Sequence, residues 1–269
     1  MQNKICLLGN NSIYTKMICK KLDKENISYS LILEKNKIDN KKGISKFFSI
    51  PIKLDNLLSS GKYKALPLLN IFTLKIFIND LFFRKSSKLK LIVGEYTDYV
   101  PKAKDIYYTP SVNHVKTAKI IEDIEADIGI FAGVGIVDGL IIEKFNRFCL
   151  NAHPAPLPEC RGGGALENTL NYGLKPSASV HFGTVGIDEG KIIKIKELEI
   201  DKDDTFNSIS TKLPILCAEL LTEVVISINN DKIFDLIENN GKLHYWKDCN
   251  INIQKNARKN LEKLLSKLD

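Results

Sequence analysis

Two polar side chains stand two positions apart at the end of an apolar run. Asn151 and His153 follow residues 148–150 (FCL), and residues at i and i+2 of a strand lie on the same face. The spacing places a carboxamide, which donates and accepts hydrogen bonds, beside an imidazole, which exchanges a proton near neutral pH. A histidine at a strand end is also often a hydrogen-bonded structural residue, so the pair by itself leaves both interpretations open.

The loop that follows this pair has an irregular sequence. Residues 154–164 read PAPLPECRGGG, with three prolines and three glycines, which fix or free the backbone in ways that regular elements do not allow. Ligands of open α/β sheets bind beside the strand ends, where this loop would lie. The loop therefore favours a functional role for Asn151 and His153.

A carboxylate occurs in a second loop, about thirty residues further on. Residues 180–182 predict the end of a strand, and residues 183–190 (GTVGIDEG) follow it. Asp188 comes after the apolar Ile187 and before Gly190, which allows partial burial. The alternative is an ordinary turn residue, because Asp is common in turns. Its pairing with Asn151 and His153 favours a functional role.

The turn after the first predicted strand has one glycine, Gly9, followed by Asn10, Asn11 and Ser12. A dinucleotide fingerprint needs three glycines there, so a nicotinamide or flavin cofactor is poorly supported. The backbone amides of this turn could still hold a phosphate at the start of a helix. A plain turn is the other interpretation.

Strand-like and helix-like segments alternate along the chain, as in a doubly wound sheet. The strand candidates are residues 4–9, 29–33, 88–94, 127–133, 148–152, 178–182 and 191–200. The helix candidates are residues 12–23, 117–124, 138–145, 165–172 and 204–225, with a hairpin around 239–241 and a charged terminal helix after them. The fold class expected is α/β, with a Rossmann-like, mostly parallel sheet.

Composition limits the other function classes. The 269 residues carry a net charge of +7, mostly from dispersed Lys, so nucleic-acid binding is not indicated. The six cysteines form no CxxC pair, which argues against a disulfide framework or a metal site. The N-terminus MQNKICLLGNN lacks the features of a secretory signal, so a cytoplasmic enzyme is expected.

Residues 65–83 are the one segment that needs a membrane check. They are rich in Leu, Ile and Phe but are interrupted by Asn70, Lys75, Asn79 and Asp80, and central charges are costly in a bilayer. We therefore expect an amphipathic helix that packs on the domain or at a subunit contact, and no membrane span.

Three ordered motifs resemble the folate-dependent formyltransferases, which include glycinamide ribonucleotide transformylase, methionyl-tRNA formyltransferase and the sugar-nucleotide N-formyltransferases. The chain reads ADIGIFAG at 126–133, NAHPAPLPECRG at 151–162 and SVHFGTVGIDEGKII at 179–193. These match the family's strand with Ala-Gly, its Asn-x-His-Pro and Arg-Gly loop, and its Val-His-Phe strand with an Asp-x-Gly loop. Residues 204–225 match more weakly.

The resemblance implies roles for these residues. Asn151, His153 and Asp188 occupy the positions of the family's catalytic triad. In the family this triad promotes the attack of an amine on the formyl carbon of 10-formyltetrahydrofolate, and no metal takes part. His181 matches a recurring histidine with a structural or indirect role, and Arg161 steadies the loop or meets a substrate anion. The slot for the folate pterin ring would be formed by Phe131, Gly133, Val134, Ile136, Val137, Gly183 and Ile187.

The resemblance also suggests a domain plan. Residues 1–225 would form the catalytic domain, with a helical insertion at about 36–90, and residues 226–269 a C-terminal extension. Transfer to methionyl-tRNA needs a longer basic C-terminal domain in the family, and the sugar-nucleotide N-formyltransferases resemble this layout more closely. The expected acceptor is therefore the amine of a nucleotide-linked sugar, with Asn11 and Ser12 as candidates for contact near its diphosphate.

Some questions stay open at this stage. Residues 155–157 (APL) replace the family's usual Ser-Leu-Leu, and Cys160 replaces the usual aromatic, so the acceptor is not fixed. The alternatives are transfer to another small amine, hydrolysis of formyltetrahydrofolate, and a folate- or nucleotide-binding module without activity. Residues 65–83 or the terminal tail could each form a homodimer contact.

Overall fold

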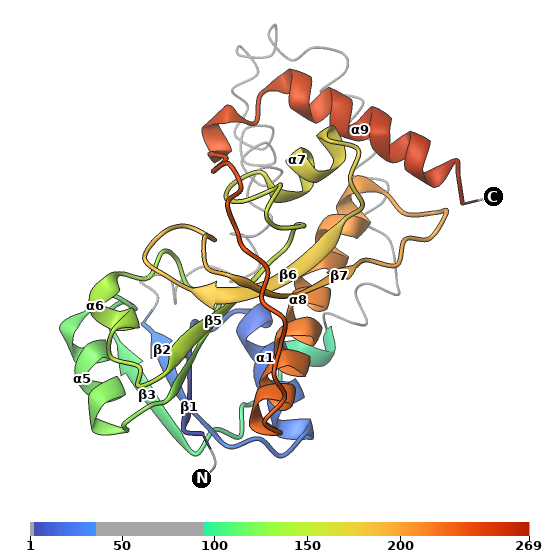
Figure 1. Cartoon of the computed structure of the whole chain (residues 1–269). Coiled ribbons are helices and arrows are strands. Elements are labelled where there is room, and N and C mark those ends of the chain that lie inside the picture. The colour runs from blue at the N-terminus through green and yellow to red at the C-terminus, as the bar shows by residue number, and fades with distance from the viewer. Residues whose placement is uncertain (1–2, 36–93, 269) are drawn as a thin grey trace, which may run out of the picture. The chain divides into compact units, whose positions relative to one another are not determined.

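The computed structural model describes residues 3–35 and 94–268 (Figure 1). By compactness the chain divides into two units, Met1–Asn36 with Tyr96–Asp269, and Lys37–Glu95. The elements described below belong to the first unit. The predicted insertion at 36–90, the helix at 65–83 and nearly all of the strand at 88–94 lie outside the described residues.

The described residues form a seven-stranded sheet in the order β3-β2-β1-β4-β5-β6-β7. Neighbouring strands from β3 to β5 are parallel, and β6 and β7 are antiparallel to their neighbours. The α/β class with a mostly parallel, Rossmann-like sheet is thus confirmed. The strands are β1 (Ile5–Gly9), β2 (Tyr29–Glu34), β3 (Asp105–Thr109), β4 (Ile128–Ala132), β5 (Phe148–His153), β6 (Ser177–Gly183) and β7 (Ile192–Glu197).

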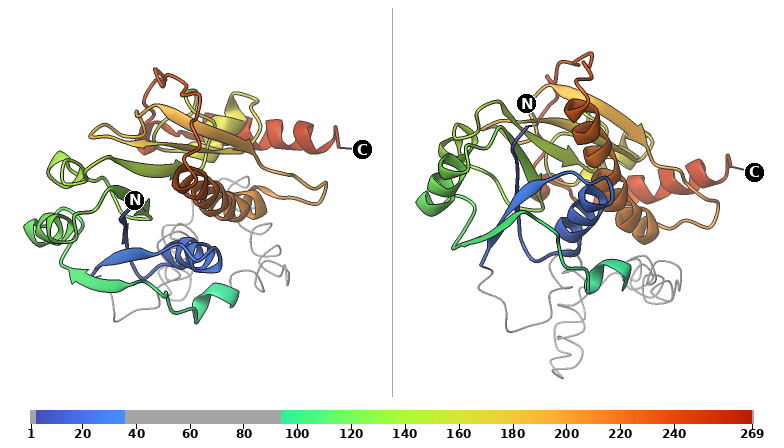
Figure 2. Two further views of the ribbon diagram at one scale, coloured as in Figure 1. Left: turned by 60° about the horizontal axis from the view of Figure 1, so that its bottom comes forward. Right: turned by 90° about the horizontal axis from the view of Figure 1, so that it is seen from below.

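Helices cover both faces of this sheet (Figure 2). Along β1, Ile5 and Leu7 belong to the core cluster that includes the buried faces of α1 and α8, whereas Cys6 and Leu8 belong to the cluster under α5 and α6. This alternation is the period of two that a strand buried on both faces requires. The helices are α1 (Ile13–Lys24), α5 (Val115–Asp123), α6 (Gly139–Ile142), α7 (Ala165–Asn171), α8 (Phe206–Asn229) and α9 (Ile251–Leu265).

Helices α7 and α9 pack against each other around a second, smaller hydrophobic core. α7 packs against α9 through Leu166, Leu170, Ala257 and Leu261, which are all buried. This cluster also takes Ile209 and Leu213 from the start of α8. The predicted charged terminal helix is therefore present as α9 and packs with α7 into the same unit as the sheet.

The predicted hairpin around 239–241 is wrong. Residues 231–245 run as an extended segment whose backbone partners lie elsewhere, with bridges from Ile237 to Ile192 and from His244 to Gly162. Asn and Gly are turn residues in general. Here, however, Asn239 is buried, and a side chain at Gly241 would stand 1.7 Å from the Pro158 carbonyl oxygen, so this glycine serves a close backbone approach.

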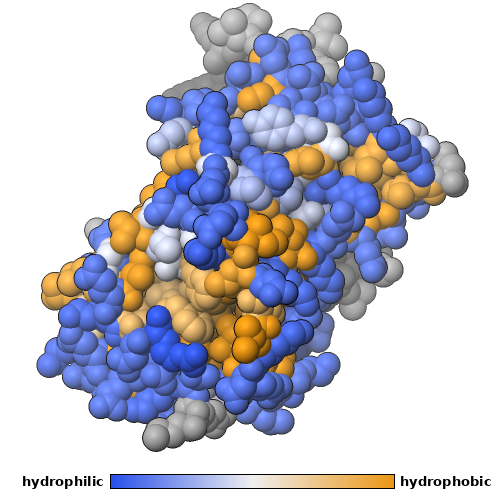
Figure 3. All heavy atoms as spheres, in the orientation of Figure 1, coloured by the Kyte–Doolittle hydropathy of each residue, from blue (hydrophilic) through white to orange (hydrophobic). Residues whose placement is uncertain are grey.

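None of the helices that the structure describes is long and apolar enough to cross a membrane. In the view of Figure 1, hydrophilic residues cover most of the surface, and apolar ones are exposed near the middle of the face (Figure 3).

Candidate active site

The site starts from the pairing of β5 with β6. The two strands are antiparallel, and their register sets Asn151 opposite His181 and His153 opposite Ser179. Asn151 Nδ2 lies 3.3 Å from His181 Nε2. Ser179 anchors the proline loop, because its hydroxyl donates to the Ala155 carbonyl at 2.7 Å and accepts from the Leu157 amide at 3.0 Å. The register therefore fixes both the side chains and the loop beside them.

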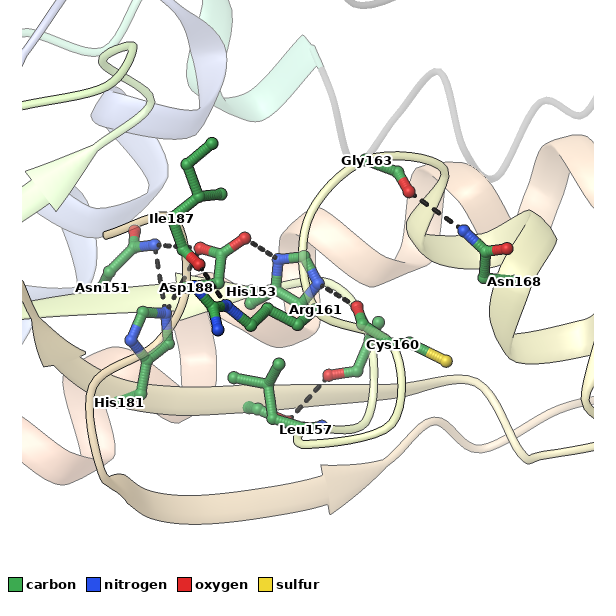
Figure 4. A network of polar contacts seen from close by, with 12 residues as sticks. Asn151, His153, Leu157, Cys160, Arg161, Gly163, Asn168, His181, Ile187 and Asp188 are labelled. Atoms are coloured by element: carbon green, nitrogen blue, oxygen red, sulfur yellow. Dashed lines mark hydrogen bonds and ion pairs between the residues drawn. The ribbon is translucent and has the colours of Figure 1, made fainter. Parts of the chain in front are cut away.

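Asp188 joins these side chains from the loop after β6 (Figure 4). Its two carboxylate oxygens take different partners: Oδ2 lies 3.1 Å from His153 Nδ1, and Oδ1 lies 3.3 Å from Asn151 Nδ2 and 3.5 Å from His181 Nε2. The structure thus brings Asn151, His153 and Asp188 together, as the sequence predicts. It adds His181 to the cluster.

The electrostatics of the cluster favour an ionised Asp188. Burial by itself would raise the pKa of this carboxyl, but hydrogen bonds from His153 and His181, together with their positive charge, outweigh burial and hold the pKa well below its usual range. Asp188 also has a φ of +45°, a left-handed conformation that Asp and Asn tolerate better than most residues. The loop therefore presents a carboxylate to the imidazoles.

His153 is buried behind this carboxylate. Its Nε2 lies 2.8 Å from the Cys160 carbonyl oxygen, while its Nδ1 faces Asp188. Both partners are acceptors, so both contacts are hydrogen bonds together only in the doubly protonated imidazolium. His181 differs, because its Nδ1 donates to the Phe182 carbonyl at 2.9 Å and its Nε2 is left for Asn151 or Asp188.

A cavity of about 210 Å³ opens beside the cluster. Asn151, His181 and Asp188 line it, and His153 does not. Six of the seven residues predicted for the pterin slot also line it: Phe131, Val134, Ile136, Val137, Gly183 and Ile187. Gly133 lies outside its lining: it has a φ of +78°, and its carbonyl accepts from Asn10 Nδ2 at 2.8 Å.

The three residues predicted to contact the substrate, Asn11, Ser12 and Arg161, lie outside the cavity lining. Arg161 Nε donates to the Ile187 carbonyl at 2.6 Å and Nη2 pairs with Glu189 at 3.0 Å, which is the loop-steadying role. The Ser12 hydroxyl caps α1 by accepting from the Thr15 amide at 3.3 Å. Neither Ser12 nor the exposed Asn11 lines the cavity. Their contact with a diphosphate remains a prediction.

The sequence missed part of the cavity wall. Gly135, Thr184, Val185 and Gly186 line it together with His181. The first four stand in the same glycine-punctuated runs as predicted residues, which was an available signal. His181 could be placed at the wall only by the pairing of β5 with β6.

This arrangement suits a reaction at a carbonyl carbon. Asn151 offers amide hydrogens at the cavity wall, and a neighbouring carboxylate and two imidazoles can hold or move a proton. Apolar side chains such as Phe131, Val134 and Ile136, with loop backbone between them, fit a flat heterocycle with polar edges. Within the described residues, no group of three or more His, Cys, Asp or Glu side chains could hold a metal ion.

Comparison with known sequences matches the chain to one family. The formyl transferase family profile matches residues 89–225, just over half of the chain. A methionyl-tRNA formyltransferase from Rickettsia typhi is 34% identical over 126 residues, which are 46% of this chain and 42% of that enzyme. The chain thus matches less than half the length of this relative.

Solved structures share the fold at low sequence identity. A sugar N-formyltransferase from a Shewanella species aligns with a TM-score of 0.55 and 13% identity over 96% of this chain and 87% of its own. An N-formyltransferase from Helicobacter canadensis, in complex with folinic acid and dTDP-3-aminofucose, aligns with a TM-score of 0.55 and 14% identity over 97% of this chain and 80% of its own.

Proposed function

Because the chain belongs to the formyl transferase family, we propose that it moves a formyl group from 10-formyltetrahydrofolate to the amine of a nucleotide-linked amino sugar. The observation that carries this proposal is the contact of Asp188 with both Asn151 and His153 beside a cavity whose lining combines polar groups with apolar side chains. The folate would enter as a substrate, with its pterin ring against Phe131, Val134 and Ile136.

The transfer is a balanced exchange at one carbon. The amine nitrogen bonds to the formyl carbon, the bond from that carbon to the folate nitrogen breaks, and the proton lost by the amine balances the one gained by the folate. Negative charge develops on the formyl oxygen between these steps. Asn151 Nδ2 would exchange one of its contacts with His181 and Asp188 for that oxygen. Such a contact is typically worth about 3 to 4 kcal/mol in the transition state.

His153 and Asp188 would move the proton between the two nitrogens. In this structure the His153 Nε2 faces the Cys160 carbonyl, so contact with the reacting groups requires the ring to exchange that carbonyl for the substrate. Catalytic hydrogen bonds often tighten or change partner only when substrate binds. Asp188, held as a carboxylate by hydrogen bonds from His153 and His181, would orient the imidazole.

The acceptor is the finer part of the proposal. The Shewanella and Helicobacter enzymes, one named a sugar N-formyltransferase and the other solved with dTDP-3-aminofucose, share this chain's fold over nearly all of its length. This supports an amino-sugar nucleotide as acceptor, and Arg161 could meet its diphosphate only by exchanging its contact with Glu189. The cytoplasmic location expected from the sequence stays a prediction.

Methionyl-tRNA is the second candidate acceptor. The observation in its favour is the 34% identity to the Rickettsia typhi enzyme over 126 residues. An assay of the purified protein with 10-formyltetrahydrofolate and each acceptor in turn, a panel of amino-sugar nucleotides and charged initiator tRNA, separates the two. Formate release without any acceptor would indicate a hydrolase.

The cluster itself is tested by Asn151→Ala and His153→Ala. We expect the Asn151 change to lower kcat by roughly 100- to 1000-fold, because one oxyanion donor is lost, while calorimetry still detects binding of 5-formyltetrahydrofolate. His153→Ala should also reduce kcat strongly. Turnover equal to that of the unmodified protein in both variants would contradict the assignment, and binding without turnover in the unmodified protein would favour a binding module.

A further inference from the structure

Side chains from two other segments hold the loop that presents Asp188. Arg161 donates to the Ile187 carbonyl at 2.6 Å. Asn239 Nδ2 donates to the next carbonyl, that of Asp188, at 2.8 Å and to the Gly190 carbonyl at 3.0 Å. The backbone on both sides of the Asp188 carboxylate is therefore tied down by side-chain donors.

Asn239 is built into the protein rather than resting on its surface. Its exposed fraction is 6%, and its two amide hydrogens have the two loop carbonyls as acceptors. Its Oδ1 atom is buried and has no hydrogen-bond partner among the described residues. A buried acceptor without a partner costs stability, so the two hydrogen bonds that Asn239 donates to the loop are made together with this cost.

The segment that carries Asn239 is itself fixed on both sides. Ile237 and Ile192 exchange backbone hydrogen bonds at 2.8 and 2.9 Å, and the Gly241 backbone lies against the Pro158 carbonyl. Further along, the His244 amide donates to the Arg161 carbonyl at 2.9 Å, and its carbonyl accepts from the Gly163 amide at 2.8 Å. One stretch of chain thus joins the proline loop to the Asp188 loop.

The geometry points to Asn239 as a positioning residue that sets the Asp188 carboxylate against His153 and Asn151. This inference rests on the proposed function, because it assigns a role within the same site. Asp188 occupies a left-handed φ of +45°, which is costly enough to need support from its surroundings. The donors of Asn239 supply that support at the Asp188 carbonyl itself.

The test compares Asn239→Ala and Asn239→Leu with Asn240→Ala. Asn240 is the exposed neighbour, so its change controls for altered backbone propensity in the segment. Leu keeps the branched shape of the Asn side chain, although it is larger, and removes both donors and the buried acceptor, so Asn239→Leu provides a second variant if Asn239→Ala unfolds. Thermal melting and circular dichroism establish which variants are folded.

We expect kcat to fall roughly 10- to 100-fold in the folded Asn239 variants, as for other displaced catalytic groups. The KM for folate should change little. The acidic limb of the kcat/KM profile should move to higher pH, because the pKa of Asp188 is lowered by His153 and His181, which face it from β5 and β6. Arg161 and Glu189 are the other charged groups beside this loop that could influence the pKa of Asp188.

A measurement that does not depend on turnover distinguishes failure of the positioning role from failure of the proposed function. In protein labelled with ¹⁵N-histidine, the His153 ring resonances, assigned with His153→Gln, should shift in both Asn239 variants and stay in place in Asn240→Ala. Shifted resonances in a protein that transfers no formyl group would support the positioning role and contradict the proposed function. Folded Asn239 variants with unchanged resonances and unchanged kcat would overturn the positioning role.

Discussion

Asp188 keeps a negative charge in a nearly buried place because two imidazoles face it. Its side chain is 14% exposed and lies between His153 and His181, the first of which has an exposed fraction of only 6%. Buried charges of this kind persist when hydrogen bonds and opposite charge outweigh the loss of hydration. The cluster is therefore a source of pH-dependent stability as well as the site to which the proposed function assigns proton transfer.

We predict that Asp188→Asn lowers the free energy of unfolding by about 2 kcal/mol at about pH 6, the usual size for hydrogen bonds to a charged group. Asn also tolerates the left-handed φ at this position, so the change tests charge rather than backbone strain. The pKa of Asp188 is lowered by folding, so its contribution is complete above its unfolded pKa of about 4 and fades as pH falls toward the folded pKa.

Urea unfolding from neutral to acidic pH measures the difference in unfolding free energy between Asp188→Asn and the unmodified protein. The gap in unfolding free energy between the two proteins should be widest near neutral pH and narrow below about pH 4. Asp235→Asn, at an exposed position, is the control and should follow the unmodified protein. A gap that keeps the same size at every pH would show that the charge of Asp188 is not what stabilises the cluster.

At the scale of elements, the loop between β4 and α6 forms one wall of the cavity and is held from outside. Asn113, just before α5, donates from Nδ2 to the Ile136 carbonyl at 2.9 Å and accepts from the Asp138 amide at 2.9 Å. Ile136 lines the cavity although its exposed fraction is 64%. The wall therefore depends on a side chain that never touches the cavity.

Asn113→Ala should weaken folate binding about tenfold, a loss of roughly 1 to 1.5 kcal/mol for the two hydrogen bonds. The expected kcat at saturating folate is unchanged, because the cluster around Asp188 lies on other elements. Calorimetry with 5-formyltetrahydrofolate measures the affinity. Ser111→Ala, at an exposed position in the loop between β3 and α5 that also carries Asn113, is the control. Equal affinity in both variants would mean that the loop keeps its shape without Asn113.

The sequence predicted the elements whose signals are local. The predicted bounds of β1, β4 and β5 and the predicted start of α8 lie within two residues of the observed ones. β3 was missed, because DIYYT is short and alternates between half-buried and exposed positions at the sheet edge. Asn239 was read as a turn residue because its partners, the Asp188 and Gly190 carbonyls, lie about fifty positions away.

In the candidate site, too, local patterns are predicted from the sequence and long-range contacts are not. The common face of Asn151 and His153 follows from the period of a strand, and Asp188 reaches both of them. The place of His181 follows only from the register of β5 with β6. The hydrogen bond between His153 Nε2 and the Cys160 carbonyl is a loop contact that no spacing rule predicts.

At the scale of the whole molecule, the terminal tail carries exposed apolar residues that we propose as a homodimer contact. Ile233, Leu236 and Ile237 are exposed by 92%, 46% and 50%, and they lie in the segment that pairs with β7, the last strand of the sheet. An apolar segment beside a sheet edge suits contact with a second copy across a two-fold axis. Of the two homodimer contacts that the sequence leaves open, the terminal tail is the one within the described residues.

Light scattering after gel filtration should give twice the chain mass for the unmodified protein. The double change Ile233→Lys with Leu236→Lys should give the mass of a single chain, because two charges would be buried at the contact. Val115→Lys places a charge at another exposed apolar residue, 68% exposed on α5, and should leave the dimer intact. A single-chain mass for the unmodified protein, or a dimer that survives the double change, would exclude this surface as the contact.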